Sequence, residues 1–166
     1  EDNRIAKFDN HTLPNLKNLV LSLNSLLQSF TNNSLPNLEA LTLDYCDLSY
    51  FPATNKLPNL QTLSLEGNSL AELPDLSDKL ETLILRSNDF KAINDKNWKS
   101  LKTLYIDEDH GLGEFSNNQL PSLVELTAQS CNLTTFPSSS SMPRIVSLLL
   151  SGNKLSSFSC VGIDTL

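Results

Sequence analysis

The sequence predicts a β-rich solenoid, a fold in which the chain winds through similar coils and short parallel strands stack on one another. Three observations predict it. A leucine pattern recurs every 20 to 22 residues, asparagine recurs at one place in that pattern, and proline recurs where several coils leave their regular part. Self-similarity at such a period is the signature of repeat architectures. Each coil buries its apolar side chains only against its neighbours, so several coils are needed for a stable core.

The repeated unit reads LxxLxLxxNxL. Its first apolar position recurs at intervals of 22, 22, 20, 21, 22 and 22 residues, at Leu16, Leu38, Leu60, Leu80, Leu101, Leu123 and Ile145. In the L-x-L core that follows, alternate side chains point to one side of the chain. We therefore expect one short strand in each coil with its leucines buried, and a parallel sheet along one side of the solenoid.

A polar position follows each predicted strand. It is filled by Asn24, Cys46, Asn68, Asn88, Asp109, Cys131 and Asn153. We expect the asparagine side chain to turn inward and bond the backbone of adjacent coils, because buried backbone groups need partners. Cysteine fits the same place as a small buried residue with a weak donor.

Each coil then closes with an apolar pair, such as Leu48 with Phe51, and proline follows three of these closures, at Pro52, Pro74 and Pro137. Proline removes a backbone donor at the point where the chain leaves its regular part.

The return path on the far side of the predicted sheet is short. The tetrapeptide Leu-Pro-Asn-Leu recurs at residues 13–16, 35–38 and 57–60, and proline there prevents a long helix. We therefore expect extended or single-turn 3₁₀ segments on this side. Trp98 occupies a column filled elsewhere by leucine or methionine, and we expect it to be a core residue rather than a binding anchor.

Together these residues resemble the leucine-rich-repeat superfamily, from about Asn3 to Phe158. The resemblance implies an α/β, mostly β, right-handed solenoid. Its curved parallel sheet lies on the concave face, and short 3₁₀ or extended segments form the convex face. Members of the superfamily are used mainly for protein recognition. The short repeats assign no subfamily.

The whole chain is expected to be one domain and a fragment of a longer array. Residues 1–12 fit the second half of a repeat that lacks its strand, residues 13–158 hold about seven repeats, and residues 159–166 fit the tail of a further, cut repeat. The paired-cysteine caps that a resemblance to extracellular repeat proteins implies do not occur.

Charge and hydropathy limit the classes of partner. The net charge is -7 and the pI is about 4.7, so nucleic acids and anionic membrane surfaces are repelled at long range, and a basic protein partner is favoured. No stretch reaches the roughly 18 apolar residues of a membrane span. We therefore expect no nucleic acid and no direct membrane insertion.

The cysteines predict no disulfide within the repeats. Cys46 and Cys131 share one column four coils apart, which is about 19 Å at roughly 4.8 Å per strand. A disulfide tolerates only about 7 Å. Cys160, after the last closure, is the thiol left to pair with something outside this chain.

Three N-glycosylation acceptors occur, at Asn10, Asn32 and Asn132. A chain with this much Asn, Ser and Thr contains about three to four such acceptors by chance. They therefore permit an extracellular or cell-surface location, and a cytoplasmic location is the alternative.

The densest polar cluster is Asp-Glu-Asp-His-Gly at residues 107–111, in a coil with one extra residue after its asparagine position. It matches neither a calcium loop nor a zinc spacing, so we expect a solvated loop and no metal. No nucleophile has a partner placed by a motif, and no phosphate-binding glycine loop occurs. We therefore expect neither catalysis nor a cofactor.

The residues expected to carry function are the strand side chains that point away from the core and line the concave face. The candidates for partner binding are Asp44, Tyr45, Glu66, Ile84, Arg86, Tyr105, Asp107 and Glu108. Tyrosine and arginine are frequent binding hot spots, and carboxylates steer a basic partner. The alternative is a solvated sheet whose tyrosines only favour strand formation.

The function we expect is a non-catalytic protein-binding module, part of a larger receptor-like or secreted signalling glycoprotein. Glycans at Asn10 or Asn32 would support it. An intracellular adaptor or regulatory subunit is a second possibility, favoured by reduced cysteines and unmodified asparagines. A third is the substrate-recognition segment of a larger enzyme.

Overall fold

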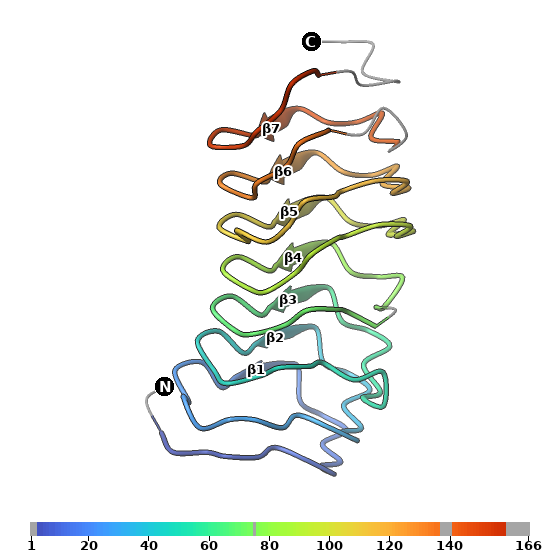
Figure 1. Cartoon of the computed structure of the whole chain (residues 1–166). Helices are drawn as coiled ribbons and strands as arrows, with labels where there is room; N and C mark the ends of the chain where they lie inside the picture. The colour runs from blue at the N-terminus through green and yellow to red at the C-terminus, as the bar shows by residue number, and fades with distance from the viewer. Residues whose placement is uncertain (1–2, 75, 137–140, 159–166) are drawn as a thin grey trace.

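The computed structural model of the protein describes residues 3–74, 76–136 and 141–158. Seven strands of three residues each form one parallel sheet in the order of the sequence (Figure 1). They are β1 (Asn18–Val20), β2 (Ala40–Thr42), β3 (Thr62–Ser64), β4 (Thr82–Ile84), β5 (Thr103–Tyr105), β6 (Glu125–Thr127) and β7 (Ser147–Leu149). The protein is a parallel β-solenoid, which confirms the predicted stack of short strands.

The leucine period sets the register of this sheet. The strands begin 22, 22, 20, 21, 22 and 22 residues apart, which are the intervals of the leucine pattern. The middle leucine of each strand pairs with that of the next, from Leu19 with Leu41 to Leu126 with Leu148. This register is strongly specified, because a slip by one residue would turn the buried side chains toward solvent.

The return segments, which run on the far side of the core from the sheet, are extended and joined by turns. Isolated parallel bridges link them from coil to coil, such as Thr12 with Ser34 and Ser34 with Lys56. Across the described ranges there is neither an α-helix nor a 3₁₀-helix, but backbone hydrogen bonds from residue i+3 to residue i close single turns, such as Leu16 N–H to the carbonyl of Leu13 and Leu38 N–H to that of Leu35. The return segments therefore combine extended stretches with single hydrogen-bonded turns, and the helical share of the expected α/β class is absent from the described residues. None of these residues belongs to a helix long and apolar enough to cross a membrane.

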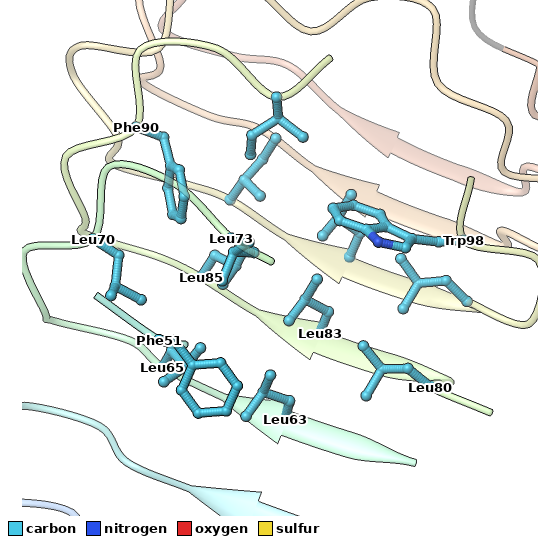
Figure 2. Packing of buried hydrophobic residues seen from close by; sticks show 14 of the residues in the cluster. Phe51, Leu63, Leu65, Leu70, Leu73, Leu80, Leu83, Leu85, Phe90 and Trp98 are labelled. Carbon is cyan, nitrogen blue, oxygen red and sulfur yellow. The ribbon is translucent and has the colours of Figure 1, made fainter. Parts of the chain in front are cut away.

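The core is one apolar cluster that runs through the coils. Strand leucines such as Leu63 and Leu83, the closure residue Phe90 and the return-side Trp98 point into the same interior (Figure 2). Trp98 is only 8% exposed, which confirms that it is a core residue. Two phenylalanine stacks, with ring centroids 5.5 to 6.2 Å apart, line the closures, Phe8–Phe30–Phe51 and Phe115–Phe136–Phe158.

The predicted polar position forms a ladder between coils, here called the sheet-side ladder. Asn68 Nδ2 donates to the carbonyl of Leu43 in the preceding coil (2.9 Å), and Asn68 Oδ1 accepts from the N–H of Leu48 (3.1 Å). Cys131 fills the same position, and its thiol donates to the carbonyl of Ile106 (2.9 Å). The inward-turned role predicted for this column is confirmed.

A second asparagine ladder, here called the return-side ladder, runs along the return segments and was not predicted from the sequence. Asn33 is fully buried. Its Nδ2 donates to the carbonyl of Phe8 (2.8 Å), and its Oδ1 accepts from the N–H of His11 (3.0 Å). Asn55 and Asn118 donate in the same way to a carbonyl of the preceding coil. Both sides of the solenoid are therefore held by side-chain amides as well as by the apolar core.

Candidate binding face of the sheet

The candidate site lies on the outer face, defined as the side chains of the strands, and of the residues directly after them, that lie on the solvent side of the sheet. Ile84 and Tyr105 are paired in register on β4 and β5. The other six candidates follow strands β2 to β5, at Asp44, Tyr45, Glu66, Arg86, Asp107 and Glu108. All eight predicted residues therefore lie on four neighbouring coils.

The turn after each strand is left-handed at one fixed position. There φ lies between 51° and 72°, at Leu23, Tyr45, Gly67, Ser87, Glu108, Ser130 and Gly152. Glycine adopts this conformation without steric penalty, whereas other residues do so less readily. The turns therefore carry Tyr45 and Glu108 in a backbone conformation that repeats along the whole sheet.

Asp107 is buried and connects three coils. Its Oδ2 accepts from Arg86 Nε (2.8 Å) and Thr127 Oγ1 (2.6 Å), and its Oδ1 accepts from the N–H of Gln129 (2.9 Å). Charge-assisted hydrogen bonds of this kind are among the stronger ones in proteins. The carboxylate is thus fully engaged within the chain, and it holds neighbouring residues in place rather than standing free for a partner.

Asp44 makes the same connection between β2 and β3. Its Oδ1 accepts from Ser64 Oγ (2.6 Å) and from the N–H of Glu66 (3.0 Å). Burial raises the pKa of Asp44, although both of these hydrogen bonds act to lower it. A sequence signal for the link exists, since each of these aspartates precedes a hydroxyl residue by 20 positions, Ser64 or Thr127.

Arg86 and Tyr105 form a second contact in this part of the face. The guanidinium carbon of Arg86 lies 4.4 Å from the centroid of the Tyr105 ring, which is a cation–π geometry. The Tyr105 hydroxyl donates to Glu125 Oε2 (3.0 Å). Arg86 is therefore fixed by an aspartate and an aromatic ring, and Tyr105 by a glutamate, so both side chains are ordered before any partner arrives.

Tyr45 is half exposed and lies over Gly67. Its hydroxyl donates to Glu66 Oε1, and this hydrogen bond is the main reason that the pKa of Tyr45 is raised. A Cβ on Gly67 would come within 2.4 Å of the Tyr45 ring, so only glycine leaves room for the ring here. Glycine in the next coil thus positions the most exposed aromatic side chain among the candidates.

An open depression on the outer face collects the charged candidates. It is lined by Glu66, Arg86, Ser87, Asp107, Glu108, Gln129 and Ser130. Three carboxylates face one guanidinium, and that guanidinium is paired with Asp107. Glu108 is exposed and accepts from Ser87 Oγ (3.0 Å). The depression is therefore acidic, and Glu66 and Glu108 provide its unneutralised charge.

Exposed apolar side chains at the two ends of the outer face were missed among the sequence candidates. Val20 is 55% exposed, Leu23 47% and Leu149 46%. They occupy the same outward columns as the candidates, so their column positions were the available signal. The face is thus acidic at its centre and apolar towards β1 and β7.

The residue 107–111 cluster is divided by the fold. Asp107 and Asp109 are buried, whereas Glu108 and His110 are exposed. Among the residues that the structure describes, no group of three or more His, Cys, Asp or Glu side chains is placed to hold a metal ion.

The remaining sequence candidates lie away from the outer face. Asn10 and Asn32 are exposed at return-side turns, whereas Asn132 is half-buried beside Cys131. Cys46 and Cys131 are free thiols in the sheet-side ladder. Cys160 and Pro137 lie outside the described residues.

Comparison of the sequence with known proteins finds no matching family model and no matching curated protein. The class that fold and site define is a parallel β-solenoid whose sheet presents an ordered, acidic outer face.

Proposed function

We propose that this solenoid is a leucine-rich-repeat-like, non-catalytic module that binds a protein partner through the outer face of its sheet, the concave face of such solenoids. The observation that carries the proposal is the ordered set of exposed groups on neighbouring coils. Tyr45 is held by Gly67 and Glu66, and Arg86 by Asp107 and Tyr105. Pre-ordered aromatic and arginine side chains lose little entropy on binding, which favours affinity.

The partner we propose presents a basic surface. Glu66 and Glu108 leave the central depression with net negative charge, and the whole chain carries -7. Complementary charge raises the rate of association and sets orientation more than it raises affinity. Binding of such a partner should therefore weaken as ionic strength rises.

We propose an extracellular or cell-surface setting, as part of a larger receptor-like protein. Support comes from the acceptors at Asn10 and Asn32, because both side chains are exposed in turns. Detection of glycans on these two residues in the native protein is the direct test. Unmodified asparagines together with a cytosolic partner would favour the adaptor function instead.

The binding proposal is tested by affinity capture with surface variants. The test variant combines Tyr45→Asn and Glu108→Lys, since asparagine tolerates the left-handed turn at position 45. The control combines Tyr50→Asn and Glu72→Lys, because Tyr50 is 49% exposed against 50% for Tyr45 and Glu72 is exposed, while neither lies on the outer face. Arg86 and Tyr105 stay intact because Arg86 is paired with Asp107 and packs on the Tyr105 ring, so replacing either would disturb contacts between coils.

The proposal expects a partner that the native chain and the control retain and the test variant loses. Circular dichroism of all three proteins checks that the fold is kept. If the test variant retains the partner while the control loses it, binding occurs elsewhere on the solenoid.

A further inference from the structure

One position of the sheet-side ladder carries an acid instead of an amide. In the preceding coil, Asn88 Nδ2 donates to the carbonyls of Leu65 (2.9 Å) and Leu85 (2.8 Å), and Asn88 Oδ1 accepts from the N–H of Leu70 (3.0 Å). The ladder therefore uses one side-chain acceptor and one side-chain donor at each asparagine. Asp109 occupies the next position along this ladder.

Asp109 reproduces only the acceptor half of this arrangement. Its Oδ1 accepts from the N–H of Phe90 (3.3 Å), as Asn88 Oδ1 does from Leu70. Its Oδ2 takes the place of the amide nitrogen, is buried, and has no hydrogen-bond partner among the described residues. The residue as a whole is 0% exposed. A buried carboxylate oxygen without a donor is strongly unfavourable, whereas a protonated oxygen can donate to a backbone carbonyl.

We propose that Asp109 is a buried proton-binding site, with the proton on Oδ2 acting as the ladder donor, and that loss of this proton weakens the coil between β5 and β6. The neutral acid then matches an asparagine in shape and in hydrogen-bonding pattern. The ionised form matches it in shape only, because Oδ2 then has no proton to donate and stays a buried acceptor without a partner among the described residues.

The charged and titratable groups around Asp109 do not replace the missing donor. Burial raises the pKa of Asp109, and hydrogen bonding to the backbone of Phe90 and Asn88 lowers it by less. Asp89 of the preceding coil raises this pKa further, and His110 only partly opposes Asp89. The His110 ring is exposed, with Nδ1 2.9 Å from the carbonyl of Ser130. In the following coil Cys131 stays a neutral thiol, because burial raises its pKa to about 12.

Two more acidic side chains belong to the same coil, and neither donates a hydrogen bond to Asp109 Oδ2. Asp107 is engaged by Arg86, and Glu108 is exposed. Burial thus remains the dominant influence and raises the pKa of Asp109 from 3.8 to about 7.

The direction of the pH effect follows from this shift. Between pH 3.8 and about 7 the folded chain holds a proton on Asp109 that the unfolded chain has released. The contribution of the protonated acid to the free energy of unfolding is therefore fully present below pH 3.8. It is lost as pH rises towards 7. An interval of about three pH units corresponds to as much as a thousandfold change in the unfolding equilibrium.

The test compares urea unfolding of the whole chain with that of Asp109→Asn from pH 4 to pH 8. Asparagine supplies the donor at every pH, so the two proteins should unfold alike near pH 4. At pH 8 the variant should be the more stable, by up to about a thousandfold in the unfolding equilibrium. Asp89→Asn is the control, because it removes a neighbouring exposed carboxylate and leaves the buried acid in place. It should still lose stability as pH rises, with the loss displaced towards lower pH because Asp89 no longer raises the pKa of Asp109.

A second measurement needs no variant. The carboxyl ¹³C resonance of Asp109 in the folded native chain should titrate near pH 7. A resonance that titrates near pH 4 would overturn the proposal, as would an Asp109→Asn variant that gains no stability at pH 8 relative to pH 4.

Discussion

At the scale of the residue, the outer face depends on a few side chains that reach across to the next coil. Tyr45 lies over Gly67, and Asp107 accepts hydrogen bonds from two adjacent coils. Each contact joins residues about 20 positions apart in the chain, so one side chain fixes the relative position of two coils. Loss of such a residue should destabilise the solenoid more than loss of an equally polar neighbour.

Gly67→Ala should lower the free energy of unfolding by about 1 to 3 kcal/mol, because the new Cβ meets the Tyr45 ring and φ at this position is left-handed. Gly113→Ala is the control, since a Cβ there would meet nothing within 4 Å and its φ is not in that region. Urea unfolding measures both. Equal effects of the two substitutions would show that Tyr45 is not held by this contact.

Asp107→Ala should lower the free energy of unfolding by about 2 to 3 kcal/mol, because Arg86 and Thr127 lose a shared acceptor in a largely buried site. The adjacent Glu108→Ala removes the same charge from an exposed side chain and should change stability by no more than about 0.5 kcal/mol. Thermal or urea unfolding of both variants measures the two losses of stability. If the two lose similar stability, Asp107 is not the structural link described above.

At the scale of the element, each coil is held by an apolar interior and by two ladders of polar side chains. The sheet-side ladder satisfies carbonyls at the ends of the strands, and the return-side ladder does the same for extended segments that have only isolated bridges. In the part of the chain that the structure describes, the return side has isolated bridges in place of a regular sheet, so its amides are expected to contribute more to the stability of that side.

Asn33→Ala should lower the free energy of unfolding by about 2 to 4 kcal/mol, because it leaves the carbonyl of Phe8 and the N–H of His11 without their side-chain partner. Asn15→Ala, at an exposed turn position of the preceding return segment, is the matched control with an expected change near zero. The free energies of unfolding in urea give the comparison. A loss for Asn33→Ala no larger than that for Asn15→Ala would contradict the role of the second ladder.

The sequence predicted the elements better than it predicted their polar contacts. Leucines at a fixed interval report burial directly, so strand positions and register followed from them. The roles of Asp44, Asp107 and Asn33 depend on which hydroxyl or amide lies in the next coil, and no single repeat displays that. The outward columns placed the candidate residues on neighbouring coils, but position alone did not reveal that Asp44 and Asp107 accept hydrogen bonds within the chain.

At the scale of the whole molecule, the protein is a one-dimensional stack in which every strand pairs only with its neighbours in sequence (Figure 1). Such a stack offers a long, continuous surface for binding. Its outer face combines an acidic centre with apolar ends, and its charged residues are ordered by contacts between coils. This combination is the basis for the proposed recognition of a basic protein partner.

The measurement that tests this claim most directly is carboxyl footprinting of the chain alone and in complex with its captured partner. The account predicts that the partner protects Glu66 and Glu108 from labelling and leaves Glu72 and Glu114 as reactive as before, since these two exposed glutamates lie off the outer face. Protection of Glu72 or Glu114, with Glu66 and Glu108 unchanged, would contradict it.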